Sequence, residues 1–124
     1  MKKQIYIALI TVFIVSAYAI FRIGSTGAAP ATEVSYSREV YPILESRCAA
    51  CHMGEFVSEG LDMNTYESLL EGSQNGPVII PGDVGNSLLV KMVTEGKMPK
   101  RGPKLTPAQI QILSDWINAG APNN

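Results

Sequence analysis

The hydrophobic positions of this chain follow two different patterns. Over residues 5–21 apolar side chains run almost without a break, interrupted only by Thr11 and Ser16. This run is apolar on every face and follows Lys2 and Lys3, which is the form of a secretory signal or an N-terminal membrane anchor and not of a buried core helix. The first part of the chain therefore predicts export.

The length of this run leaves its fate open between two outcomes. It exceeds the roughly 7 to 15 residues of a cleavable apolar region, yet falls a little short of the ~20 that comfortably span a bilayer. The triplet 17–19, Ala-Tyr-Ala, has the form of a cleavage site, but it lies inside the run. We therefore favour retention of residues 1–23 as an anchor, with Lys2 and Lys3 on the cytoplasmic side. The following domain is then expected on the periplasmic side of the inner membrane, or free in the periplasm after cleavage.

A different spacing begins after a linker at residues 24–33, which is rich in small residues and glycine. Residues 34–124 show short helical patterns separated by glycine and proline turns, without the alternation that indicates strands. We predict one small all-α domain. Ser37 is the expected cap of a first helix that reaches Cys48, and Pro42 delays its regular part to about Tyr41 because proline lacks the backbone donor.

Capping signals predict three further helices. The second begins at Asn64, with Glu67 as its capping-box partner, and ends at Gly72. The third begins at Asn86 or Ser87 and ends before a glycine at position 96.

The last helix carries the strongest signals, because Thr106 and Gln109 form a capping box and Gly120 stops the helix. Proline fits its first position, 107. Its predicted inward face consists of Ile110, Leu113, Trp116 and Ile117.

Composition narrows the function. The 124 residues are 17% charged with a formal net charge of −1, which gives no basic field for binding nucleic acid. Hydrophobic residues reach 46%, but many of them belong to the apolar run and cannot build the core of the domain. A small domain with a thin core usually needs a metal, a cofactor or a disulfide.

Both cysteines and the only histidine of the chain lie in the segment Cys48-Ala49-Ala50-Cys51-His52. This is the C-x-x-C-H pattern of c-type haem attachment. Two thiols three positions apart on a helical turn can add to the two vinyl groups of one haem, and the next imidazole then lies below the iron. We therefore predict one covalent haem c held by Cys48 and Cys51, with His52 as the proximal iron ligand.

Three other interpretations of these residues are weaker. Zinc needs about four protein ligands, and the chain has no further cysteine or histidine. A thioredoxin-like dithiol requires a βαβ setting that this sequence lacks. A disulfide between Cys48 and Cys51 closes so small a loop that it constrains the unfolded chain little.

The second axial position decides between electron transfer and ligand chemistry. Met53 adjoins His52 and cannot reach the opposite face, Met92 suits the apolar face of a helix, and Met63 precedes a cap. Met98 lies after a helix end in a proline-stiffened loop, which can hold a thioether at a fixed distance from iron. We predict Met98 as the distal ligand.

Together these segments resemble a class I cytochrome c, of the small subgroup with an insertion between the haem motif and the distal methionine. The resemblance covers Tyr36 to Pro122 and is carried by "VYPILESRCAACH", "GLDMNTYESLL", "IIPGDVGNSLLVKMV", "KMP" and "LTPAQIQILSDWINAGAP". It implies a helical domain wrapped around the haem, with the last helix packed across the first. It also implies that Cys48 and Cys51 hold the haem and that His52 and Met98 bind its iron. Many relatives have two prolines after this methionine, where this chain has Pro99 and then a lysine.

We therefore expect an electron carrier, not an enzyme, that passes single electrons between redox proteins and contacts the membrane through its N-terminal helix. The segment from Lys97 to Lys104 contains four cations and no acidic residue. This loop is suited to steer an acidic partner. If Met98 is not a ligand, the alternative is a five-coordinate haem that senses a gas or acts as a peroxidase.

Overall fold

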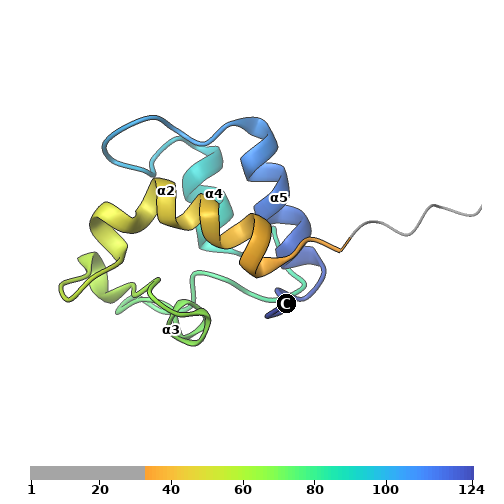
Figure 1. Cartoon of the computed structure of the whole chain (residues 1–124), viewed down its shortest axis with the longest axis horizontal. Coiled ribbons are helices and arrows are strands. Elements are labelled where there is room, and N and C mark those ends of the chain that lie inside the picture. Colours follow the sequence, from red (N-terminus) through yellow and green to blue (C-terminus); the bar gives the residue numbers. More distant parts are fainter. Residues whose placement is uncertain (1–32) are drawn as a thin grey trace, which may run out of the picture. The chain divides into compact units, whose positions relative to one another are not determined.

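A computed structural model describes residues 33–124 of the chain (Figure 1). The predicted anchor segment 1–23 and nearly all of the predicted linker 24–33 lie outside the described residues. The elements are the π-helix η2 (Tyr36–Val40), α2 (Tyr41–His52), the 3₁₀ turn η3 (Ser58–Gly60), α3 (Tyr66–Glu71), α4 (Leu88–Thr94) and α5 (Pro107–Asn118). Over this part of the chain the prediction of an all-α fold is confirmed, since the only strand-like pairing is an isolated bridge between Ser73 and Gly76. No helix among residues 33–124 combines the length and the hydropathy that crossing a membrane requires.

The first helical segment starts with a widened turn. In η2 the backbone N–H of Val40 donates to the carbonyl of Ser35 at 3.2 Å, and that of Tyr41 donates to Tyr36, both five residues back. Pro42 has no N–H to continue the usual ladder, and a π-turn before it accommodates this loss. Regular helix therefore begins at Tyr41, as predicted.

The cap of this segment is Ser35 and not Ser37, so that prediction was wrong. The Ser35 hydroxyl accepts a hydrogen bond from the Arg38 N–H at 3.4 Å. The Ser37 hydroxyl instead donates to the carbonyl of Asn124 at 2.9 Å, and the Tyr36 N–H donates to the Asn124 side chain at 2.8 Å. The C-terminal residue thus fastens the start of the domain, and Figure 1 shows the C-terminus near this segment.

The second predicted helix, α3, begins one residue later than expected. Thr65 is its cap, and its hydroxyl accepts from the Ser68 N–H at 3.1 Å while the Thr65 N–H donates to the Ser68 hydroxyl at 3.2 Å. Asn64 and Glu67 therefore do not form the capping box. Gly72 ends the helix with a φ of 90°, as predicted.

Ser87 precedes α4, as one of the two predicted starts, but its hydroxyl does not cap the helix. It donates to the Asp83 carbonyl at 2.7 Å and accepts from the Ile80 N–H at 2.9 Å, which fixes the preceding turn. Gly96 follows the end of α4 with a φ of 66°, as expected for a glycine stop.

The predictions for α5 are confirmed. The Thr106 hydroxyl accepts from the Gln109 N–H at 3.2 Å, and the Gln109 side chain accepts from the Thr106 N–H at 3.0 Å. Leu113, Trp116 and Ile117 are fully buried, and Ile110 packs partly buried against the same core.

Helix α5 packs against both η2 and α4. This confirms, at η2, the expectation that the last helix packs on the first helical segment. Aromatic rings join η2 to α5 and to α3, with ring centroids 5.5 Å apart for Tyr36 and Trp116 and 5.2 Å apart for Tyr36 and Tyr66. The aromatic cluster therefore lies at the start of the first helical segment, while the other end of α2 also meets the hydrophobic core, through Cys48 (Figure 1).

Candidate haem-binding site

The last turn of α2 carries the three residues that the C-x-x-C-H pattern singles out. Cys48 is half-buried and packs against the hydrophobic core, whereas Cys51 is exposed, and both are free thiols. His52 is the final residue of the helix and is 8% exposed. One helical turn therefore brings a half-buried thiol, an exposed thiol and a buried imidazole together.

The surroundings of His52 fit an iron ligand. Its Nδ1 atom is buried and has no hydrogen-bond partner. Because buried polar atoms in proteins are nearly always paired, an unpaired imidazole nitrogen needs an explanation such as a metal or another bound group. The backbone on the same residue is well held, since the Met63 N–H donates to the His52 carbonyl at 2.8 Å. The backbone at His52 is thus held in place, while the Nδ1 atom of its ring has no hydrogen-bond partner among the described residues.

Cys48 is a poor nucleophile in this setting. Burial raises the pKa of its thiol to about 11, and the neighbouring Cys51 adds to the rise. Reactive dithiols work through a lowered pKa, which keeps the attacking sulfur ionised at neutral pH. The Cys48 environment therefore argues against the dithiol oxidoreductase interpretation.

Met98 lies in the loop after α4. It is partly buried and packs against the same hydrophobic core as Cys48. The backbone N–H groups of Lys97 and Met98 both donate to the carbonyl of Met92, at 2.9 and 3.1 Å. The loop is thus anchored at the residue predicted to bind iron, whereas ligation itself stays a prediction.

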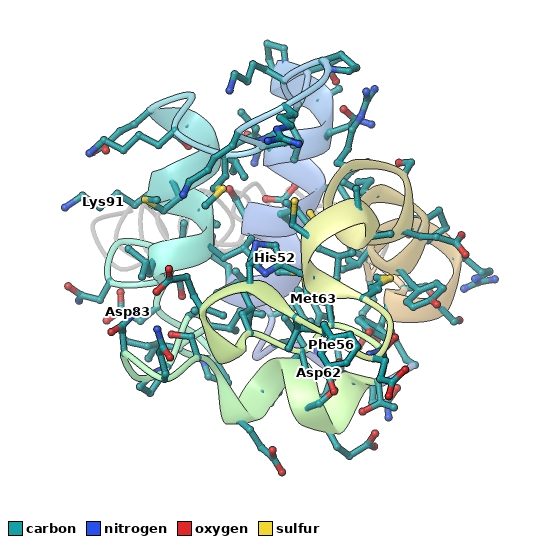
Figure 2. All side chains as sticks on the ribbon, turned by 90° about the vertical axis from the view of Figure 1, so that its left-hand side faces the viewer. His52, Phe56, Asp62, Met63, Asp83 and Lys91 are labelled. Atoms are coloured by element: carbon teal, nitrogen blue, oxygen red, sulfur yellow. The ribbon has the colours of Figure 1, made fainter. Side chains whose placement is uncertain are left out.

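Met63 is closer to the candidate site than the sequence indicated. It is 3% exposed, and its backbone is hydrogen-bonded to that of His52. Figure 2 shows Met63 and His52 on the same side of the molecule. Its position before the expected cap at Asn64 was only a weak signal, and the sequence does not reveal which residue the Met63 backbone contacts.

Asn64, expected as a helix cap, holds the loop that follows His52. Its side chain accepts from the Gly54 N–H at 2.9 Å and donates to the Gly54 carbonyl at 3.0 Å. It also donates to Asp62 at 2.7 Å. These hydrogen bonds tie Asn64 to Gly54, two residues after the histidine of the motif.

A shallow groove of about 300 Å³ lies beside the last turns of α2. Its lining comes from the helix and from the loop after Met98, namely Ser46, Arg47, Ala50, Arg101, Gly102 and Pro103. The Nε atom of Arg47 is buried without a hydrogen-bond partner. A buried guanidinium nitrogen without a partner is suited to pair with an acidic group of a bound molecule, whereas Arg38 is exposed and Trp116 is part of the core.

Comparison with known proteins gives one result that bears on this site. Neither the curated proteins nor the solved structures contain a match to this chain. Residues 48–102, from the first cysteine of the motif past Met98, match a family model described as Planctomycete cytochrome C. The helical structure, the C-x-x-C-H turn and this match together support a cytochrome c-type domain in this chain.

Proposed function

We propose that this protein is a one-electron carrier with a single covalent haem c, and that it is not an enzyme. The observation that carries the proposal is the C-x-x-C-H turn at the end of α2, where the buried imidazole of His52 has a nitrogen without a partner. The match of the surrounding segment to a cytochrome c family supports it. When bound, the haem supplies a reversible one-electron couple of its iron.

The residues of the last turn have separate tasks in this proposal. Cys48 and Cys51 bind the haem through thioether bonds, which consume both thiols. His52 binds the iron through its imidazole. The backbone of His52 is held by the hydrogen bond from the Met63 N–H to the His52 carbonyl. Because Cys48 is half-buried, its thioether bond to the haem would lie next to the hydrophobic core and away from water.

Met98 is the proposed distal ligand, which assigns the domain to the class I cytochromes c. A thioether ligand favours ferrous iron, raises the reduction potential and closes the last coordination position. The hydrogen bonds from residues 97 and 98 to Met92 hold the loop at this position and support the assignment. Without this ligand, the protein would be a five-coordinate haem protein that senses a gas or acts as a peroxidase.

Carbon monoxide binding tests the proposal. The protein is expressed with its leader in a bacterium that attaches haem c, and the ferrous spectrum is recorded before and after carbon monoxide is added. We expect the wild-type spectrum to stay unchanged, and Met98→Ala to bind the gas. Met92→Ala is the matched control, because this methionine is also partly buried but lies on α4. Carbon monoxide binding by the wild type would favour the sensor or peroxidase alternative, and colourless protein with two free thiols would overturn haem binding.

The proposed location is the periplasmic side of the inner membrane, with residues 1–23 as the anchor. The support is the apolar run behind Lys2 and Lys3. Membrane fractionation and an intact mass of the native protein test this point. A mass that lacks the leader, together with recovery in the soluble periplasmic fraction, would replace the anchor by a cleaved signal.

We also propose that the basic loop, residues 97–104, contacts an acidic redox partner. Lys100 and Arg101 are exposed, and Lys104 donates to the carbonyl of Pro99. Lys97 pairs with Glu95 at 2.7 Å, so its charge is partly offset. Attraction between opposite charges is screened by salt, and the rate of electron exchange with an acidic partner should therefore fall as ionic strength rises. A rate that does not depend on salt would count against this partner.

A further inference from the structure

Phe56 is an exposed aromatic residue four positions after His52. Its side chain is 86% exposed, compared with 39% for Ile80 and 41% for Leu88. Figure 2 shows Phe56 farther from the middle of the molecule than His52. Single exposed apolar residues are common on proteins, so exposure alone indicates nothing. What distinguishes Phe56 is the loop that carries it and the charge around it.

The loop around Phe56 is held in place by hydrogen bonds at two points, Gly54 and Glu59. Next to the histidine, Asn64 clamps Gly54 through the two hydrogen bonds described above. Farther out, the carbonyl of Glu59 accepts from the Gln74 N–H at 3.0 Å, and its carboxylate accepts from the Gln74 side chain at 2.8 Å. An aromatic side chain on a loop that is already ordered binds a partner with little further loss of entropy, which is typical of a binding hot spot.

The segment of the chain that contains Phe56 carries ionisable charge of one sign. Residues 48–90 contain no lysine or arginine, and their ionisable carboxylates are Glu55, Glu59, Asp62, Glu67, Glu71 and Asp83. Glu55 and Glu59 are exposed on the loop itself. This arrangement is the reverse of the basic loop 97–104. A membrane surface rich in anionic lipids would be repelled by these carboxylates, whereas a protein with a basic surface would be attracted.

We propose that Phe56, Glu55, Glu59 and Asp62, here called the Phe56 surface, form a docking site for a basic redox protein that presents an apolar contact to the phenyl ring. This inference rests on the proposed function and adds a second partner to it. A carrier must accept one electron from one protein and give one to another, and surfaces of opposite charge let two different proteins be recognised. One electron crosses the interface, so that one centre is oxidised, the other is reduced, and no bond forms or breaks.

Nuclear magnetic resonance can locate this surface on the intact haem protein. The ¹⁵N-labelled ferrous protein is titrated with a lysine-rich cytochrome c as a basic redox probe, and in parallel with an acidic ferredoxin. We expect the basic probe to shift the amide signals of residues 54–62 and the acidic probe to shift those of 97–104. Shifts from the basic probe that lie elsewhere, or no shifts at all, would overturn the proposal.

Substitutions then separate the apolar contact from the charge. We expect Phe56→Ser to weaken binding of the basic probe roughly tenfold, as for an aromatic hot spot, and Glu55→Gln to weaken it less and to reduce its salt dependence. Leu88→Ser is the matched control at an exposed apolar residue and should leave binding unchanged. An equal effect of Leu88→Ser, or no effect of Phe56→Ser, contradicts the proposal.

Two other occupants of the Phe56 surface give different results. If the ring covers the haem of its own chain, Phe56→Ser changes the visible spectrum and the reduction potential without any partner. If a second copy binds there, the amide signals of 54–62 shift with protein concentration alone. Either result overturns the proposal. Electron exchange with hexacyanoferrate, a small reagent, distinguishes failure of the docking site from failure of the proposed function. If the protein exchanges electrons with hexacyanoferrate but binds no basic probe, the docking site is refuted and the electron carrier is not.

Discussion

The two ends of the first helical segment are built in different ways. At its start, Ser35 and Tyr36 are hydrogen-bonded to Asn124 at 3.0 and 2.8 Å, and Tyr36 stacks near Trp116 in the core. At its end, one thiol is exposed and the buried His52 has an unpaired ring nitrogen. One end is therefore fastened by contacts within the chain, and the other presents a thiol and a ring nitrogen that have no partner among residues 33–124.

This difference separates stability from function along a single segment. Contacts between η2, α5 and the C-terminal residues hold the domain together, so the last turn of α2 is free to carry reactive and unpaired groups. Proteins commonly keep unsatisfied groups at functional sites and compensate for them elsewhere in the fold. Changes at the last turn of α2 should therefore alter haem attachment, and changes elsewhere should alter the stability of the fold.

The largest effect is expected when both thiols are removed. Cys48→Ser with Cys51→Ser should abolish covalent haem attachment completely, since a hydroxyl does not form the thioether. The measurement is a haem stain after denaturing electrophoresis, together with an intact mass. Ser46→Ala, an exposed change on the same helix, should keep the haem. Covalent haem in the double variant would show that the two thiols are not the attachment points, and the last turn of α2 would then not be the functional end of the segment.

The two thiols should differ strongly in reactivity before the haem is attached. Because burial raises the pKa of Cys48 from 9.0 to about 11, its thiolate population at pH 8 is about a hundredfold below that of an ordinary cysteine. Alkylation of haem-free protein with iodoacetamide, followed by mass spectrometry, should label the exposed Cys51 first. Labelling of Cys48 should accelerate as the pH rises toward 11. Equal labelling rates at pH 8 would show that Cys48 is not buried in this form.

A smaller but clear loss of stability is expected at the turn after α3. Gly72 has a φ of 90°, and a Cβ atom there would lie 2.7 Å from the Gly76 carbonyl oxygen and 2.8 Å from Pro77. Gly72→Ala should therefore lower the free energy of unfolding of the haem protein by about 2 kcal/mol, measured in denaturant. At Gly85 the nearest atom would be 3.6 Å away, in Asp83, so Gly85→Ala is the matched control with little effect. Equal losses for both variants would exclude the steric explanation.

The features that the sequence predicted are local. Pro42 determines the start of regular helix at Tyr41, and Thr106 with Gln109 determines the start of α5, because the interacting atoms lie within a few residues of each other. The haem motif is local for the same reason. Signals of this kind require no knowledge of the tertiary structure.

The features that the sequence did not predict depend on contacts between distant residues. Ser37 is of a residue type that commonly caps helices, but its hydroxyl donates to the carbonyl of Asn124, 87 positions away. Asn64 likewise holds Gly54 and leaves the capping of α3 to Thr65. Several polar residues could fill each role, and only the folded chain decides which one is close enough.

The smallest effect concerns two tyrosines in the fastened half of the molecule. The Tyr66 hydroxyl donates to the Ala121 carbonyl at 2.7 Å, whereas the Tyr36 hydroxyl is buried without a partner. Tyr66→Phe should cost about 1 kcal/mol of unfolding free energy, because it leaves the carbonyl of the fully buried Ala121 unpaired. The measurement is denaturant unfolding of the haem protein.

Tyr36→Phe also removes a tyrosine hydroxyl, but here we expect no loss of unfolding free energy. Burial raises the pKa of Tyr36, with its neighbours Tyr41, Glu67 and Tyr66 adding to the rise, so the hydroxyl stays neutral and only a hydrogen-bond partner could stabilise it there. Because no hydrogen bond is lost, the substitution should be neutral or slightly stabilising. A loss in Tyr36→Phe as large as that in Tyr66→Phe would mean that the Tyr36 hydroxyl has a partner in solution. The start of the segment would then contain no unpaired side chain, and the contrast with the His52 end would be sharper still.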